Sequence, residues 1–171
     1  KPTPKSICQK RFTVTRAVSG CSGVTNHRAK SNRLGFSVSG KDGREAGTFA
    51  VTAETTPPVS ADPSTLLKAT ESLAGLADAV NVTDGAGAKS HMASLAAAAL
   101  LVQAGIEPVL QFTVRDRNRI ALQNDLLGAA ALGIPNILCL TGDNVDTGDQ
   151  PEAKMVMELD SRGLMALTRD M

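Results

Sequence analysis

Aromatic side chains are almost absent from this chain: only 2% of its 171 residues are aromatic, with four Phe and no Trp or Tyr. Proteins that stack on bases depend on aromatic faces, so the sequence predicts no nucleic-acid partner. No apolar run reaches the ~18 residues of a transmembrane helix, and we expect no membrane partner. The hydrophobic share of 42% suits one globular domain, whose core volume must come from Ala, Val, Leu and Ile.

Cysteine and histidine are also scarce. Three Cys (Cys8, Cys21 and Cys139) and two His stand far apart, without the close pairing that zinc sites use. An odd number of scattered thiols predicts reduced cysteines and a cytoplasmic protein. We therefore predict neither a metal site nor a structural disulfide.

Acidic residues are nearly missing from the first 45 positions. That stretch holds ten Lys or Arg against two acids, whereas the rest of the chain holds eight against fifteen. Residues 1–46 are also rich in Ser, Thr and Gly without helical or strand periodicity, which predicts a basic, disordered leader. The same composition is typical of an organelle transit peptide, or of upstream sequence that is not part of the mature protein. The folded domain is predicted at residues 47–171.

Residues 47–171 alternate regularly between strands and helices. Apolar runs predict strands at 48–55, 79–85, 108–114 and 136–142, and helical segments are predicted at 64–76, 90–105, 117–133 and 151–171. Asp62 before Pro63 is a strong helix start, and Gly105 is a helix stop. Short, almost continuous apolar strands are typical of a parallel sheet covered by helices.

The even spacing of this repeat favours an α/β fold of the (β/α)8 TIM-barrel type. The strand-end residues Glu54, Thr83, Thr113 and Thr141 stand 29, 30 and 28 residues apart, about one βα unit per step. A doubly wound sheet is the second choice, but no G-x-G-x-x-G follows the first strand. Because a complete barrel needs about 250 residues, only about four βα units, the N-terminal half of a barrel, are predicted here.

Each predicted strand ends on a hydroxyl and an acid. The endings are Thr-Ala-Glu (52–54), Val-Thr-Asp-Gly (82–85), Gln-Phe-Thr-Val-Arg-Asp (111–116) and Leu-Thr-Gly-Asp (140–143). Parallel strands of a barrel place these ends on one rim, where active sites are built, so a polar, acidic pocket is predicted. Thr is common in strands and Asp caps turns and helices, so none of these residues identifies a site alone.

The loop TDGAGAKS (83–90) invites comparison with a phosphate-binding loop, but it lacks the G-x-x-x-x-G-K-S/T pattern. Its backbone amides and the following helix could still bind a phosphate group. A barrel for a phosphorylated ligand therefore stays open as an alternative. His91 is expected just inside that helix, partly exposed and not a ligand.

Four stretches carry a more specific signal: VTAETTPP (51–58), VNVTDGAG (80–87), VLQFTVRDRNRI (109–120) and CLTGDNVDTGDQPEA (139–153). In this order and spacing they resemble the strand-end motifs of methylenetetrahydrofolate reductases. The resemblance implies a flavin-dependent barrel oxidoreductase of one-carbon metabolism and methionine biosynthesis. Such an enzyme reduces its folate substrate, 5,10-methylenetetrahydrofolate, to 5-methyltetrahydrofolate, with FAD as cofactor and NAD(P)H as reductant.

The resemblance also implies roles for individual residues. Glu54, before the stiff Pro57-Pro58 pair, matches the general acid that protonates the bridging nitrogen of the folate substrate. A carboxyl group in this role needs a dry site without a cationic partner. Asp143 matches a catalytic carboxylate that binds substrate and lies near the flavin. The cofactor contacts implied by the resemblance are Thr83, Gln111, Thr141, Gly142, Asp143, Lys154 and Met155.

The chain also departs from the family. Gln111 stands where better-known members carry His, and Thr141 stands where they carry Arg. The family's remaining flavin contacts and its nicotinamide site lie on later strands, so this chain alone is expected to be catalytically incomplete. The alternative is a truncated, non-catalytic half-barrel, which would self-associate as a homo-oligomer through its open edges or need a complementing partner.

Overall fold

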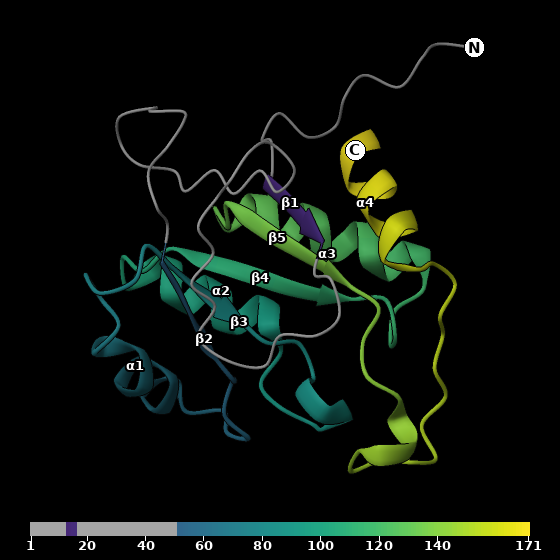
Figure 1. Cartoon of the computed structure of the whole chain (residues 1–171), viewed down its shortest axis with the longest axis horizontal. Coiled ribbons are helices and arrows are strands. Elements are labelled where there is room, and N and C mark those ends of the chain that lie inside the picture. The colour runs from purple at the N-terminus through teal and green to yellow at the C-terminus, as the bar shows by residue number, and fades with distance from the viewer. Residues whose placement is uncertain (1–12, 17–50) are drawn as a thin grey trace.

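A computed structural model of the chain describes residues 13–16 and 51–171. These residues form one parallel sheet with the strand order β1-β5-β4-β3-β2 (Figure 1). Its strands are β1 (Thr13–Arg16), β2 (Thr52–Thr55), β3 (Ala79–Val82), β4 (Pro108–Thr113) and β5 (Asn136–Leu140). From β2 to β5, strands that follow one another in the chain are neighbours in the sheet.

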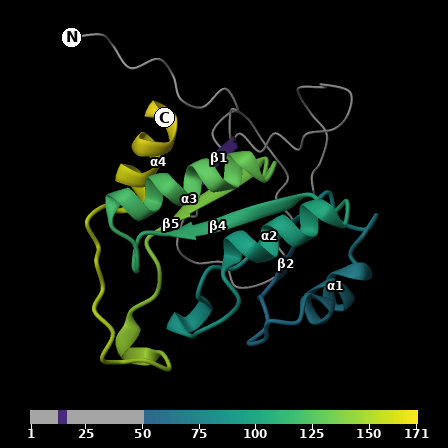
Figure 2. The same cartoon turned by 180° about the vertical axis from the view of Figure 1, so that it is seen from behind.

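A helix follows each strand from β2 onward. The helices are α1 (Pro63–Glu71), α2 (Ser94–Gln103), α3 (Arg119–Ala131) and α4 (Ser161–Asp170), with short 3-10 turns η1 (Ala86–Ala88) and η2 (Val145–Thr147). Figure 2 shows α2 and α3 against β4 and β5, with α1 beside α2 and α4 beside α3. The predicted α/β fold with four βα units and a parallel sheet is therefore confirmed, and it is compatible with part of a TIM barrel.

The core lies between the sheet and the helices. Alternate strand residues point into it, because side chains of a strand alternate between its two faces. The fully buried members from the strands and helices include Val80, Val82, Leu110, Phe112, Ile137, Leu66, Leu101, Leu122 and Leu164. Burial of each such side chain stabilises the folded state by roughly 1.5–3 kcal/mol. This burial holds the helices against one face of the sheet, and the loops lie at the ends of the strands.

The helix boundaries follow local capping chemistry. Asp62 accepts a hydrogen bond from the Ser64 amide at 2.9 Å with Pro63 at the first helical position, as predicted. Gly105, with φ of +77°, follows the end of α2, also as predicted. The first helix ends at Glu71, five residues before its predicted end, and its chain then turns through Gly75 at φ of +79°.

The predicted start of the second helix is wrong by four residues, and His91 lies outside it. Residues 90–93 precede α2, and two of their amides bind distant parts of the chain. The Ser90 amide donates to Asp149 Oδ2 at 2.9 Å, and the Met92 amide donates to the Pro58 carbonyl at 2.9 Å. These contacts hold residues 90–92 against other loops, and the helix begins only after Ala93, whose φ and ψ of −53° and 132° are not helical.

The last helical segment, predicted at 151–171, is helical only from Ser161. The preceding residues form a loop fixed by neighbours: the Val156 amide donates to the Arg115 carbonyl at 2.8 Å, and Glu158 accepts from the Arg119 amide at 2.8 Å. Asp160 then caps α4 by accepting from the Gly163 amide at 2.7 Å.

One strand, β1, lies where no strand is predicted. Thr13 pairs with Asn136 and Arg16 pairs with Cys139, in parallel with β5. The expectation that residues 1–46 contain no strand is therefore wrong at these four positions, three of which are β-branched. The other leader residues and the predicted domain start at residue 47 lie outside the described residues. Within the described ranges, none of the helices has the length and apolar character that crossing a membrane requires.

Candidate active site

Glu54 and Gln111, two of the predicted site residues, are joined by a hydrogen bond across the sheet. The Gln111 amide Nε2 donates to Glu54 Oε2 at 3.0 Å, although β3 runs between their strands. Glu54 pairs in register with Asn81. Because neighbouring strand residues such as Val80 point into the core, Glu54, Asn81 and Gln111 form a polar row on the face away from the helices.

The surroundings of Glu54 differ from the prediction. Its side chain is exposed, so the expected water-free site is wrong for the part of the chain that the structure describes. The reason is its position: β2 is an edge strand, and the helices cover the opposite face of the sheet. The hydrogen bond from Gln111 comes from a neutral amide, which fixes the carboxylate without bringing a cation to it.

The loop after β2 is held at both of its prolines. The ring Nδ1 of His91 donates to the Pro57 carbonyl at 2.9 Å, and the Met92 amide donates to the Pro58 carbonyl. Since proline has a fixed φ, these contacts fix the segment that follows Glu54. His91 therefore positions this loop, a role that the sequence analysis missed.

The hydroxyl of Thr83 is buried and lacks a hydrogen-bond partner among the described residues. The residue is 6% exposed, and its backbone amide donates to the Thr55 carbonyl at 3.1 Å. A buried hydroxyl without a partner costs about 1–3 kcal/mol, and such a group calls for an explanation such as a ligand or water. The predicted cofactor contact at Thr83 therefore has an unused donor and acceptor.

Gly142 directly follows Thr141 after β5 and has φ of +98°. A Cβ at this position would lie 2.8 Å from the Cβ of Arg115 and 3.4 Å from that of Thr113. Glycine therefore allows the turn to lie directly against the end of β4. The predicted site residues Thr141, Gly142 and Asp143 thus lie at the same edge of the sheet as the other strand-end contacts.

Asp84 is saturated with partners and does not present a free acid. Its carboxylate pairs with Arg117 Nη1 at 2.7 Å and accepts from the Thr113 amide at 2.9 Å and from Ser94 Oγ at 2.9 Å. Burial alone would raise the pKa of Asp84, but the Arg117 guanidinium and these hydrogen bonds hold it below its ordinary value. Asp84 does line a cavity at the strand ends, as the predicted acidic pocket requires, but its carboxylate is already paired with Arg117.

Asp116 is bound in the same manner by its neighbour Arg115. The two guanidinium contacts are 2.8 Å from Nε and 2.7 Å from Nη2, and they raise the pKa of Arg115 above its ordinary value. Arg115 and Arg117 were not among the predicted site residues. The alternation Arg-Asp-Arg-Asn-Arg (115–119) could have identified them, because it places cations beside strand ends that are rich in Asp.

Two amides of the loop 83–90 bind carboxylates of the chain itself. The Gly87 amide donates to Asp143 Oδ2 at 2.8 Å, and the Ser90 amide donates to Asp149 Oδ2. The hydrogen bond from Ser90 lowers the pKa of Asp149 below its ordinary value. Amides that already bind carboxylates are not available to a phosphate group, so the phosphate-loop alternative is wrong for these two positions.

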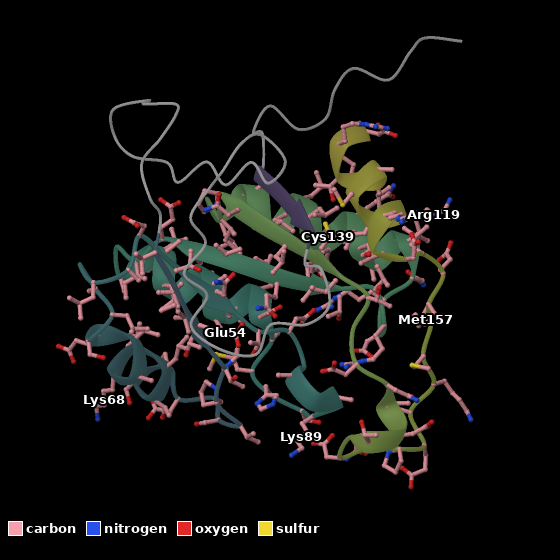
Figure 3. The ribbon with its side chains drawn as sticks, in the orientation of Figure 1. Glu54, Lys68, Lys89, Arg119, Cys139 and Met157 are labelled. Carbon is pink, nitrogen blue, oxygen red and sulfur yellow. The ribbon has the colours of Figure 1, made fainter. Side chains whose placement is uncertain are left out.

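Lys154 and Met155 lie on the loop between η2 and α4. Both are exposed, with Met155 at 43%. Within the described ranges, no hydrogen bond or ion pair joins either residue to the other predicted contacts. The neighbouring Met157 lies well apart from Glu54 in Figure 3. The structure therefore collects the strand-end residues at one edge but does not bring Lys154 and Met155 to the Glu54–Gln111 pair.

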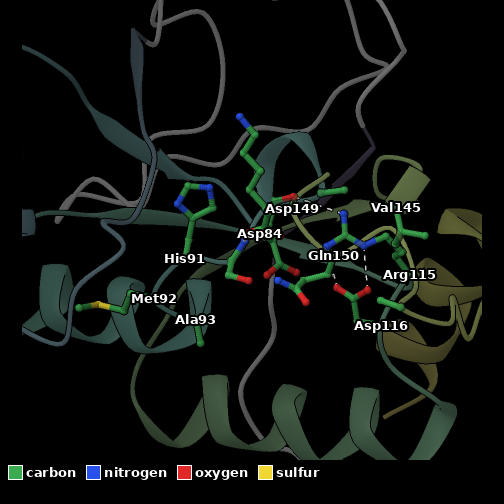
Figure 4. A pocket seen from close by; sticks show the side chains of 14 residues that line it. Asp84, His91, Met92, Ala93, Arg115, Asp116, Val145, Asp149 and Gln150 are labelled. Atoms are coloured by element: carbon green, nitrogen blue, oxygen red, sulfur yellow. Dashed lines mark hydrogen bonds and ion pairs between the residues drawn. The ribbon is translucent and has the colours of Figure 1, made fainter. Parts of the chain in front are cut away.

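A cavity of about 320 Å³ lies between the loops that follow β3, β4 and β5. Figure 4 shows Arg115 and Asp116 on one wall and His91 and Met92 on the other. None of the predicted cofactor contacts lines it. The cavity and the predicted cofactor contacts are therefore separate features. Arg115 links them, because it lines the cavity and its guanidinium donates to the backbone carbonyl of Asp143 at 3.4 Å.

A family model described as methylenetetrahydrofolate reductase matches residues 41–167, which is well over half of the chain. No curated protein matches the chain at a significant level. The matched range includes the ends of strands β2 to β5 and every predicted site residue, whereas β1 lies before it.

Proposed function

The chain belongs to the methylenetetrahydrofolate reductase family, and on this premise we propose that it serves the flavin-dependent reduction of 5,10-methylenetetrahydrofolate to 5-methyltetrahydrofolate. The family match over residues 41–167 carries the proposal. The proposed cofactor is FAD, the proposed reductant is NAD(P)H, and the proposed place of action is the cytoplasm. The proposed route is one-carbon metabolism that supplies methionine.

One observation at the strand edge supports a flavin. The Thr83 hydroxyl is buried without a partner among the described residues, so it is available to a bound ligand. The residues proposed to hold FAD are Thr83, Gln111, Thr141, Gly142, Asp143, Lys154 and Met155. When bound, FAD would supply the electron pair that reduces the one-carbon unit of the folate.

We propose Glu54 as the general acid. Its Oε atoms would hold the proton that passes to the bridging nitrogen of the folate substrate, which opens the five-membered ring. Gln111 Nε2 holds Oε2 in place, and the Pro57-Pro58 loop behind Glu54 is anchored by His91. Because Glu54 is exposed, bound folate and flavin would have to supply the exclusion of water that keeps such a proton on the carboxyl group.

We propose Asp143 as the second catalytic carboxylate and as a folate contact. Its Oδ2 accepts from the Gly87 amide at 2.8 Å, which fixes the side chain against the neighbouring loop. A carboxylate held in this manner is suited to pair with the N–H donors on the edge of a pterin ring. Its negative charge would also favour a cation that develops on the substrate.

The four βα units would form the N-terminal half of a (β/α)8 barrel. The remaining flavin contacts and the nicotinamide site would come from later strands, on the same chain or a completing partner. The alternative remains a non-catalytic half-barrel that self-associates as a homo-oligomer. The intact mass of the native product separates the two, because a complete barrel requires about 250 residues.

Glu54→Gln in the native product tests the assignment of the acid. Removing a general acid lowers turnover by about 10²–10⁴-fold, whereas binding of FAD should stay unchanged because the amide keeps the size of the side chain. Glu71→Gln, at an exposed position that ends α1, is the matched control and should keep full turnover. Turnover of Glu54→Gln near the wild-type value would show that Glu54 is not the acid. Failure of the wild-type product to bind FAD would overturn the flavin proposal itself.

A further inference from the structure

The side chain of Arg115 lies where the loops after β3, β4 and β5 meet (Figure 4). It is 6% exposed. Its Nη1 donates to the Gly85 carbonyl at 3.3 Å and to the Asp143 carbonyl at 3.4 Å. Its own carbonyl accepts from the Val156 amide at 2.8 Å. Arg115, on the loop after β4, therefore contacts three other segments. They are the loop after β3, the loop after β5 and the loop that contains Met155.

Two glycines make room for this arginine. A Cβ on Gly85, which has φ of +58°, would lie 2.5 Å from Arg115 Nη2. A Cβ on Gly142 would lie 2.8 Å from the Cβ of Arg115. A side chain at either glycine would displace the guanidinium or the turn. The loops therefore fit one another only around Arg115.

The guanidinium is itself held by Asp116. Nε and Nη2 pair with the two carboxylate oxygens, and this leaves Nη1 for the two carbonyls. The side chain of Asp116 is 51% exposed, so it fixes the arginine from the solvent side. Asp143 joins the same loops a second time through its hydrogen bond from the Gly87 amide. The loops after β3 and β5 are thus joined both by the Arg115 guanidinium and by the Asp143 carboxylate.

We propose that Arg115 is a positioning residue, which holds the Thr141–Asp143 turn and the Gly85–Gly87 segment in the arrangement that binds the flavin. This inference rests on the proposed function for the identity of the ligand. Four of the five N–H donors of Arg115 are engaged by Asp116, Gly85 and Asp143, so its role is to hold the loops and not to act on the ligand. It sets the place of Asp143 and of the neighbouring cofactor contacts.

The test compares Arg115→Ala, Arg115→Lys and Asp116→Asn with the wild-type full chain. The first readout is the dissociation constant of FAD, measured from flavin fluorescence well below the melting temperature of each variant. The second is hydrogen exchange of the Gly87 amide in the absence of FAD, relative to the amides of α3. Arg119→Ala is the matched control, because it removes an exposed arginine of the same segment, whose ion pair with Glu158 is 3.5 Å long.

Arg115→Ala should weaken FAD binding roughly tenfold to a hundredfold, the range for loss of buried charge-assisted hydrogen bonds, and should speed the exchange of the Gly87 amide. Arg115→Lys keeps the charge but loses the planar, bidentate guanidinium. Its affinity for FAD should therefore lie between that of the wild type and that of Arg115→Ala. Asp116→Asn, which leaves the arginine in place, should show a smaller loss in the same direction. The dissociation constant of FAD for the control Arg119→Ala should stay within about twofold of the wild-type value, as expected for an exposed ion pair.

The outcomes separate this inference from the proposed function. FAD binding of Arg115→Ala equal to that of the wild type would overturn the inference and leave the function standing. A wild-type native product that binds no FAD would overturn the function, and the exchange of the Gly87 amide would then decide the loop-holding role. Faster exchange in Arg115→Ala alone supports that role. Exchange of the Gly87 amide in Arg115→Ala at the wild-type rate would show that Arg115 does not hold these loops.

Discussion

The carboxylate of Asp84 and the guanidinium of Arg117 form an ion pair at 2.7 Å, with their side chains only 9% and 16% exposed. The two residues lie 33 positions apart, on the loops after β3 and β4. Arg117 also contacts Asp125 at 3.0 Å, and its guanidinium carbon lies 4.9 Å from the centre of the Phe112 ring. A strand-end acid that looked like part of a binding pocket therefore joins two βα units.

Loss of one partner of this pair should destabilise the chain strongly. Arg117→Ala leaves the buried Asp84 carboxylate without its cation, and breaking such a pair costs about 3–5 kcal/mol. Chemical denaturation followed by circular dichroism measures the loss. Arg162→Ala, at an exposed position on α4, is the control and should change the free energy of unfolding by less than about 0.5 kcal/mol. Equal stability of both variants would show that the pair contributes nothing.

The same pair predicts an acid-sensitive stability. The pKa of Asp84 is lowered in the folded state, so between the folded and unfolded pKa values the unfolded chain binds more protons. The stabilisation is complete above the unfolded value of about 3.9 and is lost as the pH falls through the folded value. The difference in unfolding free energy between wild type and Asp84→Asn should therefore shrink below about pH 4. A difference that is constant with pH would contradict the assignment.

Local patterns predicted the βα units well. The run PVLQFT (108–113) is β4, because its residues form a short apolar strand that fits a buried parallel sheet. The Asp62-Pro63 pair begins α1, because capping depends only on adjacent residues. The order of the strands followed in turn, since short right-handed βαβ connections place successive parallel strands side by side.

Partners far away in the sequence were not predictable in this manner. Residues 90–93 look like the start of an Ala-rich helix, but Pro58 and Asp149 bind their amides. Asp84 and Asp116 look like free acids until the fold brings arginines to them. The exposure of Glu54 depends on what covers the second face of the sheet, which no local pattern encodes. That the strand-end residues gather at one edge of the sheet was thus predictable, whereas their ion pairs and the exposure of Glu54 were not.

Cys139 should be unreactive in the folded chain. Burial raises the pKa of its thiol to about 12, so the nucleophilic thiolate is nearly absent at neutral pH. In a variant with Cys8→Ser and Cys21→Ser, iodoacetamide should leave Cys139 unmodified without denaturant and alkylate it in urea. Mass spectrometry distinguishes the two states. Alkylation at the same rate in both conditions would show that Cys139 is accessible.

Thr83 allows a test that separates folding from ligand binding. Thr83→Val keeps the shape of the side chain and removes a buried hydroxyl that lacks a partner in the described residues. The ligand-free chain should therefore become more stable, by about 1 kcal/mol. If the hydroxyl binds FAD, the same variant should bind FAD more weakly, by roughly tenfold for one lost hydrogen bond.

The two effects of Thr83→Val have opposite signs, so general damage to the fold cannot produce both. Thermal unfolding without FAD gives the first, and titration of flavin fluorescence gives the second. Thr65→Val, at an exposed position on α1, is the control and should change neither by more than experimental scatter. Greater stability with unchanged FAD affinity would mean that the Thr83 hydroxyl does not contact the cofactor. Lower stability would mean that the hydroxyl has a partner in the native state, because only a satisfied group loses energy when it is removed.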